Sequence, residues 1–286
     1  MSAIYTHDII YIPPSEEESA PLEVALGCSW KKCTFCDFAK DDFTILTDQQ
    51  IDINIKGLAE LYPKHERVFL LGENAFVIST HKLLDIFKQV REYMPFVKSF
   101  AMYARIDDVC AKTEEEILSL RNSGLSALHI GVESGCDLIL AAREKGVTSQ
   151  QMLPAFRKLD LVGVGYFVTI ILGLGGRKYS RLHAIQTAQL LNKIHPKNIW
   201  CLKLNLFEGT PLYKEWQRGN FDQMTPIEVL LELKLLLQNL TVVDCLFEDT
   251  TVMDLYTLKG NLPYQKNMIL EAIDQLHAQY ESSLIV

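Results

Sequence analysis

The chain has 286 residues, of which 48% are hydrophobic, and its formal net charge at pH 7 is −8. Its length and apolar content are enough for a sizeable buried core, in one large domain or two ordinary ones. The acidic balance argues against a nucleic-acid-binding protein that relies on net positive charge, and against a polybasic membrane anchor.

The N-terminal segment 1–24 shows no basic region followed by an apolar run, so it does not resemble a secretory signal. No apolar stretch reaches the roughly 18 residues that span a bilayer. We therefore expect a cytoplasmic protein whose seven cysteines do not form disulfides. Four of them lie among apolar neighbours and are expected to be small core residues: Cys110, Cys136, Cys201 and Cys245.

Apolar runs that predict strands alternate along the chain with amphipathic segments that predict helices. The predicted strands are 23–30, 67–72, 96–106, 127–134, 165–176 and 198–207. The predicted helices are 48–61, 80–93, 113–123, a helical segment up to Gly146, 149–163, 180–195, 227–240 and 263–280. Start and stop signals support three of them: Thr113 with Glu116 and a C-terminal Gly124, Thr148 with Gln151, and Thr225 with Pro226 and Glu228.

Six continuous apolar strands alternating with helices predict an α/β fold with a buried parallel sheet. Six units are too few for a closed eight-unit barrel, so a partial barrel and an open doubly wound sheet both remain possible. Either architecture places its active site at the carboxyl ends of the strands. Polar residues do lie at or near the predicted strand ends: Glu73, Asn74, Tyr103, Arg105, His129, Glu133 and Asn205, with the glycine turn "GLGG" after the fifth strand.

The most informative stretch is "GCSWKKCTFCDF", which places Cys28, Cys33 and Cys36 within nine positions. A structural zinc site needs four ligands, so a fourth would have to come from a distant residue such as His65 or His81. An iron–sulfur cluster is the alternative, because three thiolates leave one iron of a 4Fe–4S cluster open for a chelating small molecule. Unliganded thiols that lie close together by chance are the third possibility.

The same stretch resembles the cluster motif of the radical S-adenosylmethionine superfamily, in which an aromatic residue, here Phe35, precedes the last cysteine. Four residues rather than three separate the first two cysteines. This spacing is similar to that of a bacterial branch of iron–sulfur oxidoreductases related to oxygen-independent coproporphyrinogen oxidase. The resemblance implies a partial (β/α)6 TIM-type barrel with a C-terminal helical extension. The corresponding layout is an N-terminal segment 1–20, a barrel core 21–215 and an extension 216–286 that closes the barrel.

Further segments carry the resemblance along the chain. "LLGE" resembles the segment that meets the methionine amino group, and "GVESGCDLILAAREKG" and "FVTIILGLGG" resemble the fourth and fifth strand regions. "FEGTPLY" resembles the segment close to the adenine. The metal ligands are then Cys28, Cys33 and Cys36. The expected cofactor-binding residues are Phe35, Gly72, Glu73, Arg105, Glu133, Lys145, Thr169 and Asn205.

Several of these residues have a structural alternative. Glu133 suits the N-terminus of the following helix, and Lys145 suits a solvated last helical turn. Thr169 fits an ordinary strand position. Arg105 is expected to pair with Asp107 or Asp108 if it serves no ligand, and His129 on its apolar strand is expected to be a satisfied core residue.

The resemblance implies that a reduced 4Fe–4S cluster cleaves S-adenosylmethionine to a 5′-deoxyadenosyl radical, which abstracts hydrogen from a small or medium-sized metabolite. Whether the enzyme is an oxidoreductase, a lyase or a transferase is left open. An external electron donor such as flavodoxin or ferredoxin is expected, and neither nucleic acid nor membrane is. Tyr103 and Arg105 are the catalytic candidates. Asn74, Asn205 and the acidic segment with Glu248, Asp249 and Asp254 are further substrate candidates. The alternatives are a cluster- or haem-binding chaperone on a degenerate barrel and a zinc-stabilised scaffold.

Overall fold

The computed structural model describes residues 4–8, 10–38, 41–253 and 256–283. The chain divides into two compact units. Unit 1 comprises Met1–Lys31, Phe38–Ile130 and Lys158–Gly165, and unit 2 comprises Lys32–Asp37, Gly131–Arg157 and Tyr166–Val286. None of the helices in the described ranges has the length and the apolar content that a membrane-spanning segment needs.

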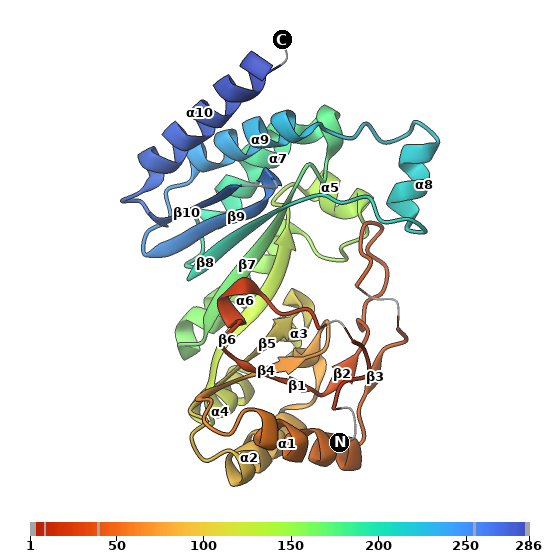
Figure 1. Cartoon of the computed structure of the whole chain (residues 1–286), viewed down its shortest axis with the longest axis vertical. Helices are drawn as coiled ribbons and strands as arrows, with labels where there is room; N and C mark the ends of the chain where they lie inside the picture. Colours follow the sequence, from red (N-terminus) through yellow and green to blue (C-terminus); the bar gives the residue numbers. More distant parts are fainter. Residues whose placement is uncertain (1–3, 9, 39–40, 254–255, 284–286) are drawn as a thin grey trace. The chain divides into compact units, whose positions relative to one another are not determined.

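Unit 1 contains a parallel arrangement of strands in the order β1-β4-β5-β6. Its elements are η1 (Pro14–Glu16), β1 (Ala20–Glu23), β2 (Ala25–Leu26), β3 (Thr44–Ile45), α1 (Asp48–Leu61), β4 (Arg67–Leu71), η2 (Ala75–Val77), α2 (Thr80–Tyr93), β5 (Ser99–Ala104), α3 (Ile106–Ala111), α4 (Glu114–Asn122) and most of β6 (Leu125–Glu133). Helix α1 packs against α2 and β1, and α2 packs against α4 (Figure 1). These helices cover apolar strands whose side chains are almost all buried, as the continuous apolar runs predicted.

In unit 2, β7, β8 and β9 are parallel, and β10 is antiparallel to β9. Its elements are α5 (Asp137–Ala142), α6 (Ser149–Val162, whose end belongs to unit 1), β7 (Gly165–Leu172), α7 (Gly176–Leu191), β8 (Asn198–Lys203), α8 (Pro211–Gln217), α9 (Pro226–Asn239), β9 (Cys245–Met253), β10 (Tyr256–Leu262) and α10 (Lys266–Ser283). Helix α9 packs against α7, α10 and β9 (Figure 1). The fold is therefore mixed α/β with mainly parallel strands.

Most helix boundaries agree with the sequence prediction, because they depend on local capping. Helices α1 and α2 span the predicted residues 48–61 and 80–93. The capping boxes predicted at Thr113 and Thr225 are present, and Thr148 exchanges hydrogen bonds with Gln151 in the same way. Helix α7 begins at Gly176 rather than at the predicted Ser180, since it starts directly after the glycine turn.

The prediction was wrong in two regions. The first strand was predicted over 23–30, but β1 ends at Glu23, and Ala25–Leu26 form a separate strand that pairs with β3. The C-terminal extension is not only helical, because β9 and β10 form an antiparallel pair within it. Residues 247–253, expected in an acidic loop, belong to β9, while Asp254 lies outside the described residues.

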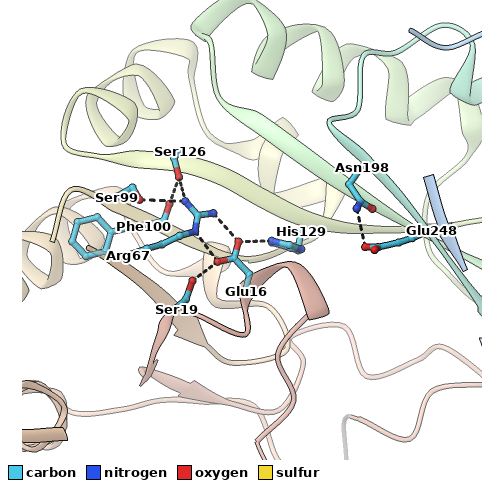
Figure 2. Close-up of polar contacts among 9 residues, drawn as sticks. All are labelled: Glu16, Ser19, Arg67, Ser99, Phe100, Ser126, His129, Asn198 and Glu248. Atoms are coloured by element: carbon cyan, nitrogen blue, oxygen red, sulfur yellow. Dashed lines mark hydrogen bonds and ion pairs between the residues drawn. The ribbon is translucent and has the colours of Figure 1, made fainter. Parts of the chain in front are cut away.

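Unit 1 also contains a buried ion-pair network near the starts of its strands (Figure 2). Glu16 is fully buried and accepts two hydrogen bonds of 2.7 Å from the Arg67 guanidinium. It also accepts one from Ser19 Oγ at 2.6 Å and lies 2.9 Å from His129 Nε2. Arg67 also donates to two hydroxyl groups, those of Ser99 on the adjacent β5 and of Ser126 on β6. His129 is thus a satisfied core residue, as predicted.

Three of the four cysteines predicted in the core are buried: Cys136, Cys201 and Cys245. Cys110 is exposed near the end of α3, so its assignment to the core was wrong. Its neighbour Val109 is buried, and the position of Cys110 on this short helix faces away from the core that Val109 joins.

Candidate functional site

The three clustered cysteines lie in the segment 27–43, which joins β2 to β3. These strands pair antiparallel, with Ala25 opposite Ile45 and Leu26 opposite Thr44, so the segment is closed at its base. Gly27 opens it with a φ of 67°, and a Cβ there would lie 2.6 Å from the carbonyl oxygen of Asp41. Only glycine tolerates this backbone conformation and close approach together.

Cys28, Cys33 and Cys36 are cysteines of intermediate exposure, and none of the three is in a disulfide. Cys28 belongs to unit 1, whereas Cys33 and Cys36 belong to unit 2. Across the described parts of the chain, no three His, Cys, Asp or Glu side chains are already grouped as a metal site. The donor set nevertheless fits iron, because three accessible, unoxidised thiols on one short segment are the ligands that an iron–sulfur cluster uses.

The second half of the motif is held against an apolar cluster of unit 2. Phe35 is 8% exposed and lies in this cluster, against which Cys33 and Cys36 also pack. Its other buried members are Cys136, Ile139, Leu174, Leu204, Leu212 and Phe221. The backbone is fixed on both sides of the ring, because the N–H of Thr34 donates to Arg143 and its carbonyl accepts from Leu212. Apolar packing and backbone hydrogen bonds thus hold the turn that carries Cys33 and Cys36.

Gly72 and Glu73 follow β4 directly. Gly72 has a φ of 132°, and a Cβ there would lie 2.9 Å from the Cβ of Ala25, so a side chain has no room. The Glu73 carboxyl group has one buried oxygen, Oε2, without a hydrogen-bond partner. Burial raises the pKa of Glu73, as does the charge of Asp41, while the backbone N–H groups of Glu73 and Gly27 partly offset these effects. An open acceptor oxygen here suits a ligand with an amino group.

Asn74 does not face a substrate, because it is completely buried and its amide is fully used. Its Nδ2 donates to Ser29 Oγ at 2.8 Å and to Asp108 at 2.6 Å, and its Oδ1 accepts from the backbone N–H of Arg105. The Arg105 guanidinium pairs with Asp107 at 2.9 Å and lies 4.9 Å from the centre of the Trp30 ring. The predicted pairing of Arg105 is therefore confirmed.

Tyr103 packs inside unit 1 with its ring edge-on to Phe69 and His129. Burial raises the pKa of its phenol, and the negative charges of Glu16 and Glu73 raise it further. The phenol therefore stays protonated at neutral pH.

Glu133 and Lys145 form a buried ion pair in unit 2, with 2.8 Å between Nζ and Oε1. Lys145 is consequently not the solvated last-turn lysine that the sequence allowed. Glu133 ends β6 with a φ of 63°, which is uncommon for a residue with a side chain. Its second oxygen, Oε2, is buried and has no hydrogen-bond partner. The pair thus leaves one carboxylate oxygen open.

The three remaining predicted residues, Thr169, Asn205 and Glu248, differ in how deeply they are buried. Thr169 is half-buried in β7 opposite Trp200 of β8, and Asn205 is exposed two residues after the end of β8. In β9, Glu248 accepts a hydrogen bond from Asn198 at 2.8 Å (Figure 2) and pairs with Lys259 at 3.1 Å. Glu248 therefore serves the packing of the strands.

A buried polar network of unit 2 was missed by the sequence reasoning. His183 of α7 lies 2.8 Å from Ser134 Oγ and 3.1 Å from the carbonyl oxygen of Ile171, so it joins the ends of β6 and β7. Glu232 of α9 accepts from the backbone N–H of Gly173 in the "GLGG" turn. The sequence did contain a signal for this network, because His183 and Glu232 are polar residues on otherwise apolar helix faces. Buried polar groups need hydrogen-bond partners, so both residues could have been predicted to have one.

The sequence profile of the Radical SAM superfamily matches residues 22–188, which is more than half of the chain. The chain belongs to the radical SAM superfamily. Members of this superfamily are enzymes that use a 4Fe–4S cluster and S-adenosylmethionine, and these are the cofactors of this enzyme. The predicted superfamily is confirmed, whereas the narrower relation to coproporphyrinogen oxidase stays a prediction. No curated protein matches the sequence.

Solved structures of radical SAM proteins share the fold. Methylornithine synthase (PylB) has a TM-score of 0.56 at 14% identity, over 92% of this chain and 85% of its own. The archaeal Methanocaldococcus infernus Elp3 has a TM-score of 0.51 at 16% identity, over 76% of this chain. The hydrogenase maturase HydG from Carboxydothermus hydrogenoformans has 0.52 at 16% identity, over 78%. This chain spans about half of the latter two proteins, 54% and 52%. At these identities the likeness shows the partial TIM-type fold alone.

Proposed function

We propose that this radical SAM enzyme abstracts a hydrogen atom from a small or medium-sized metabolite. The observation that carries the proposal is the segment 27–43, which presents three cysteines of intermediate exposure, none of them in a disulfide, between two paired strands. Cys28, Cys33 and Cys36 would each hold one iron and leave the fourth iron to the cofactor. When bound, the reduced cluster and S-adenosylmethionine supply a 5′-deoxyadenosyl radical.

The open carboxylate oxygens suggest how the chain would hold this cofactor. Glu73 Oε2 would accept a hydrogen bond from the methionine amino group, and Gly72 keeps the backbone beside it clear of side chains. Glu133 Oε2 would accept from a ribose hydroxyl, while Lys145 holds the carboxylate in place and contributes positive charge towards the methionine carboxylate. Phe35, Arg105, Thr169 and Asn205 remain proposed cofactor contacts.

Substrate specificity is proposed to reside in residues after the strands, with Tyr103 and Arg105 as catalytic candidates. We propose an external one-electron donor such as flavodoxin or ferredoxin, and a division into the segment 1–20, the core 21–215 and the extension 216–286. The cluster or haem chaperone is not favoured, because the superfamily's profile covers the motif and the strands that follow it.

Anaerobic reconstitution with iron and sulfide tests the proposal. The parent chain should take up four irons and four sulfides, and its reduced electron paramagnetic resonance signal should change when S-adenosylmethionine is added. The variant in which Cys28, Cys33 and Cys36 are alanine should bind no cluster, while Cys110→Ala should match the parent because this exposed thiol lies outside the motif. A colourless chain that binds one zinc ion would contradict the proposal, as would haem binding without any effect of S-adenosylmethionine.

A further inference from the structure

The extra residue between the first two cysteines creates a positioning problem for Cys28. Ser29, Trp30, Lys31 and Lys32 separate Cys28 from Cys33, and a longer connection has more conformations available to it. Lys31 adopts a left-handed φ of 50°, and its Nζ reaches Asp42 at 2.7 Å. That ion pair is exposed, so it contributes little to holding the connection.

We propose that Asn74 and Arg105 form a clamp that positions Cys28 for cluster binding, by holding the two residues directly after it. This inference rests on the proposed function, since it assigns a role toward the cluster. Asn74 lies three residues after the end of β4, and Arg105 lies directly after β5. The clamp therefore connects the cysteine segment to two adjacent strands of the parallel arrangement.

The Asn74 side chain can hold Ser29 in one orientation only. Both of its amide hydrogens are used, one toward Ser29 Oγ and one toward Asp108, while its oxygen accepts from the backbone N–H of Arg105. A reversed amide would set N–H against N–H at Arg105 and oxygen against the Asp108 carboxylate. Because Asn74 is completely buried, each broken hydrogen bond would leave an unsatisfied polar group.

Arg105 holds the next residue by a different interaction. Its guanidinium lies 4.9 Å from the centre of the Trp30 ring, within the range of a cation–π contact, and Asp107 fixes it from its own helix at 2.9 Å. The side chains of Ser29 and Trp30 are thus both attached to the strand ends. A segment ordered before the cluster binds loses less conformational entropy on binding, so it should hold the cluster longer.

The experiment compares Ser29→Ala, Trp30→Leu and Asn74→Asp with the parent and with Asn220→Asp, an exposed asparagine of unit 2. In the metal-free chain, we expect amide hydrogen exchange in the peptide that contains residues 28–32 to rise about fivefold or more in the three clamp variants. In the reconstituted chain, iron should be lost to a chelator faster by a similar factor. Asn220→Asp should leave both rates unchanged.

Ser29→Ala and Trp30→Leu change only the cysteine segment, so they keep the test valid if Asn74→Asp fails to fold. Parent-like exchange and parent-like iron loss in both variants would overturn the clamp while leaving the proposed function intact. A parent chain that binds no cluster would overturn the proposed function and the role of the clamp toward it. The exchange rates would still show whether the two side chains order the segment.

Discussion

The Nζ of Lys145 lies 2.8 Å from Oε1 of Glu133, and about nine-tenths of each side chain is buried. Glu133 makes this contact from a left-handed backbone conformation, which is costly for a residue with a side chain. Gly131 makes room for it, because a Cβ at that position would lie 2.1 Å from the Glu133 carboxylate. Strained residues cluster at ligand-binding and catalytic sites, so this pair at the end of β6 fits the proposed cofactor contact.

The first prediction concerns this pair. Lys145→Met should lower the free energy of unfolding by about 3–5 kcal/mol, because it leaves a buried carboxylate without its cation. Adding Glu133→Gln should restore part of the loss, since the double variant removes both charges. Urea unfolding of the two single variants, the double variant and the exposed-residue control Lys214→Met measures the coupling. Additive effects of the two substitutions would contradict a direct interaction.

The second prediction concerns pH. Burial alone would raise the pKa of Glu16, but hydrogen bonds from Arg67, His129 and Ser19 outweigh it and lower the pKa to about 2. At pH values above 4.5, the ordinary pKa of a glutamate, the ionised form therefore contributes about 3 kcal/mol to the free energy of unfolding. This contribution is lost as the pH falls from 4.5 towards 2. Burial also lowers the pKa of His129, which the Glu16 contact partly offsets. Stability is therefore also lost as the pH falls from 6.5 towards this lowered pKa, because the unfolded chain takes up the proton first.

Glu16→Gln should accordingly destabilise unit 1 at neutral pH, and its unfolding curve should approach that of the parent near pH 3. Thermal unfolding at pH 7, 5, 4 and 3 measures this, with the exposed neighbour in Glu17→Gln as the control. A constant difference between Glu16→Gln and the parent over this range would show that the Glu16 charge does not contribute.

The third prediction concerns Gly72. Its φ of 132° is available almost only to glycine, and a Cβ would lie 2.9 Å from Ala25, so Gly72→Ala should cost about 2–3 kcal/mol. Gly219→Ala is a matched control, because Gly219 also has a positive φ of 73°, but a Cβ added there would meet no atom within 4 Å. Its cost should be about 1 kcal/mol. Equal losses in chemical denaturation would mean that the contact with Ala25 is unimportant.

The fourth prediction concerns Phe35. Phe35→Ala removes a buried ring from the apolar cluster of unit 2 and should cost about 3–5 kcal/mol. Phe35→Leu keeps most of the apolar volume and should cost less than about 1.5 kcal/mol. If the ring also contacts the cofactor, as proposed, Phe35→Leu should weaken S-adenosylmethionine binding more than it lowers stability. Phe38→Ala is the control, since that ring is about half exposed. A stability loss in Phe38→Ala as large as that in Phe35→Ala would contradict the assignment.

Local signals in the sequence were sufficient for most helices and for the inner strands. Helix α4 begins at Thr113 because the threonine and Glu116 satisfy each other's backbone N–H groups, and this depends only on residues three apart. Strands were predicted over 67–72 and 96–106, where β4 and β5 lie, because continuous apolar runs are typical of buried parallel strands. The three cysteines indicated the superfamily together with the segments that resemble it at the ends of later strands.

Long-range pairing explains what the sequence did not predict. β9 contains Glu248, Asp249 and two threonines, so its strand character depends on pairing with β8 and β10. Glu16 meets Arg67 across 51 positions of sequence, which no local pattern encodes. Asn74 was predicted as a substrate contact because it follows a strand, yet its burial and its bond to Ser29, 45 positions away, make it part of the scaffold.

The most direct test of the central claim is the formation of 5′-deoxyadenosine by the reconstituted, dithionite-reduced chain after addition of S-adenosylmethionine. We predict that the parent and Cys110→Ala form this product at comparable rates. The variant that lacks the thiols of Cys28, Cys33 and Cys36 should form none above the protein-free background. Equal product formation by that variant and the parent would contradict the assignment of the three cysteines as the cluster ligands.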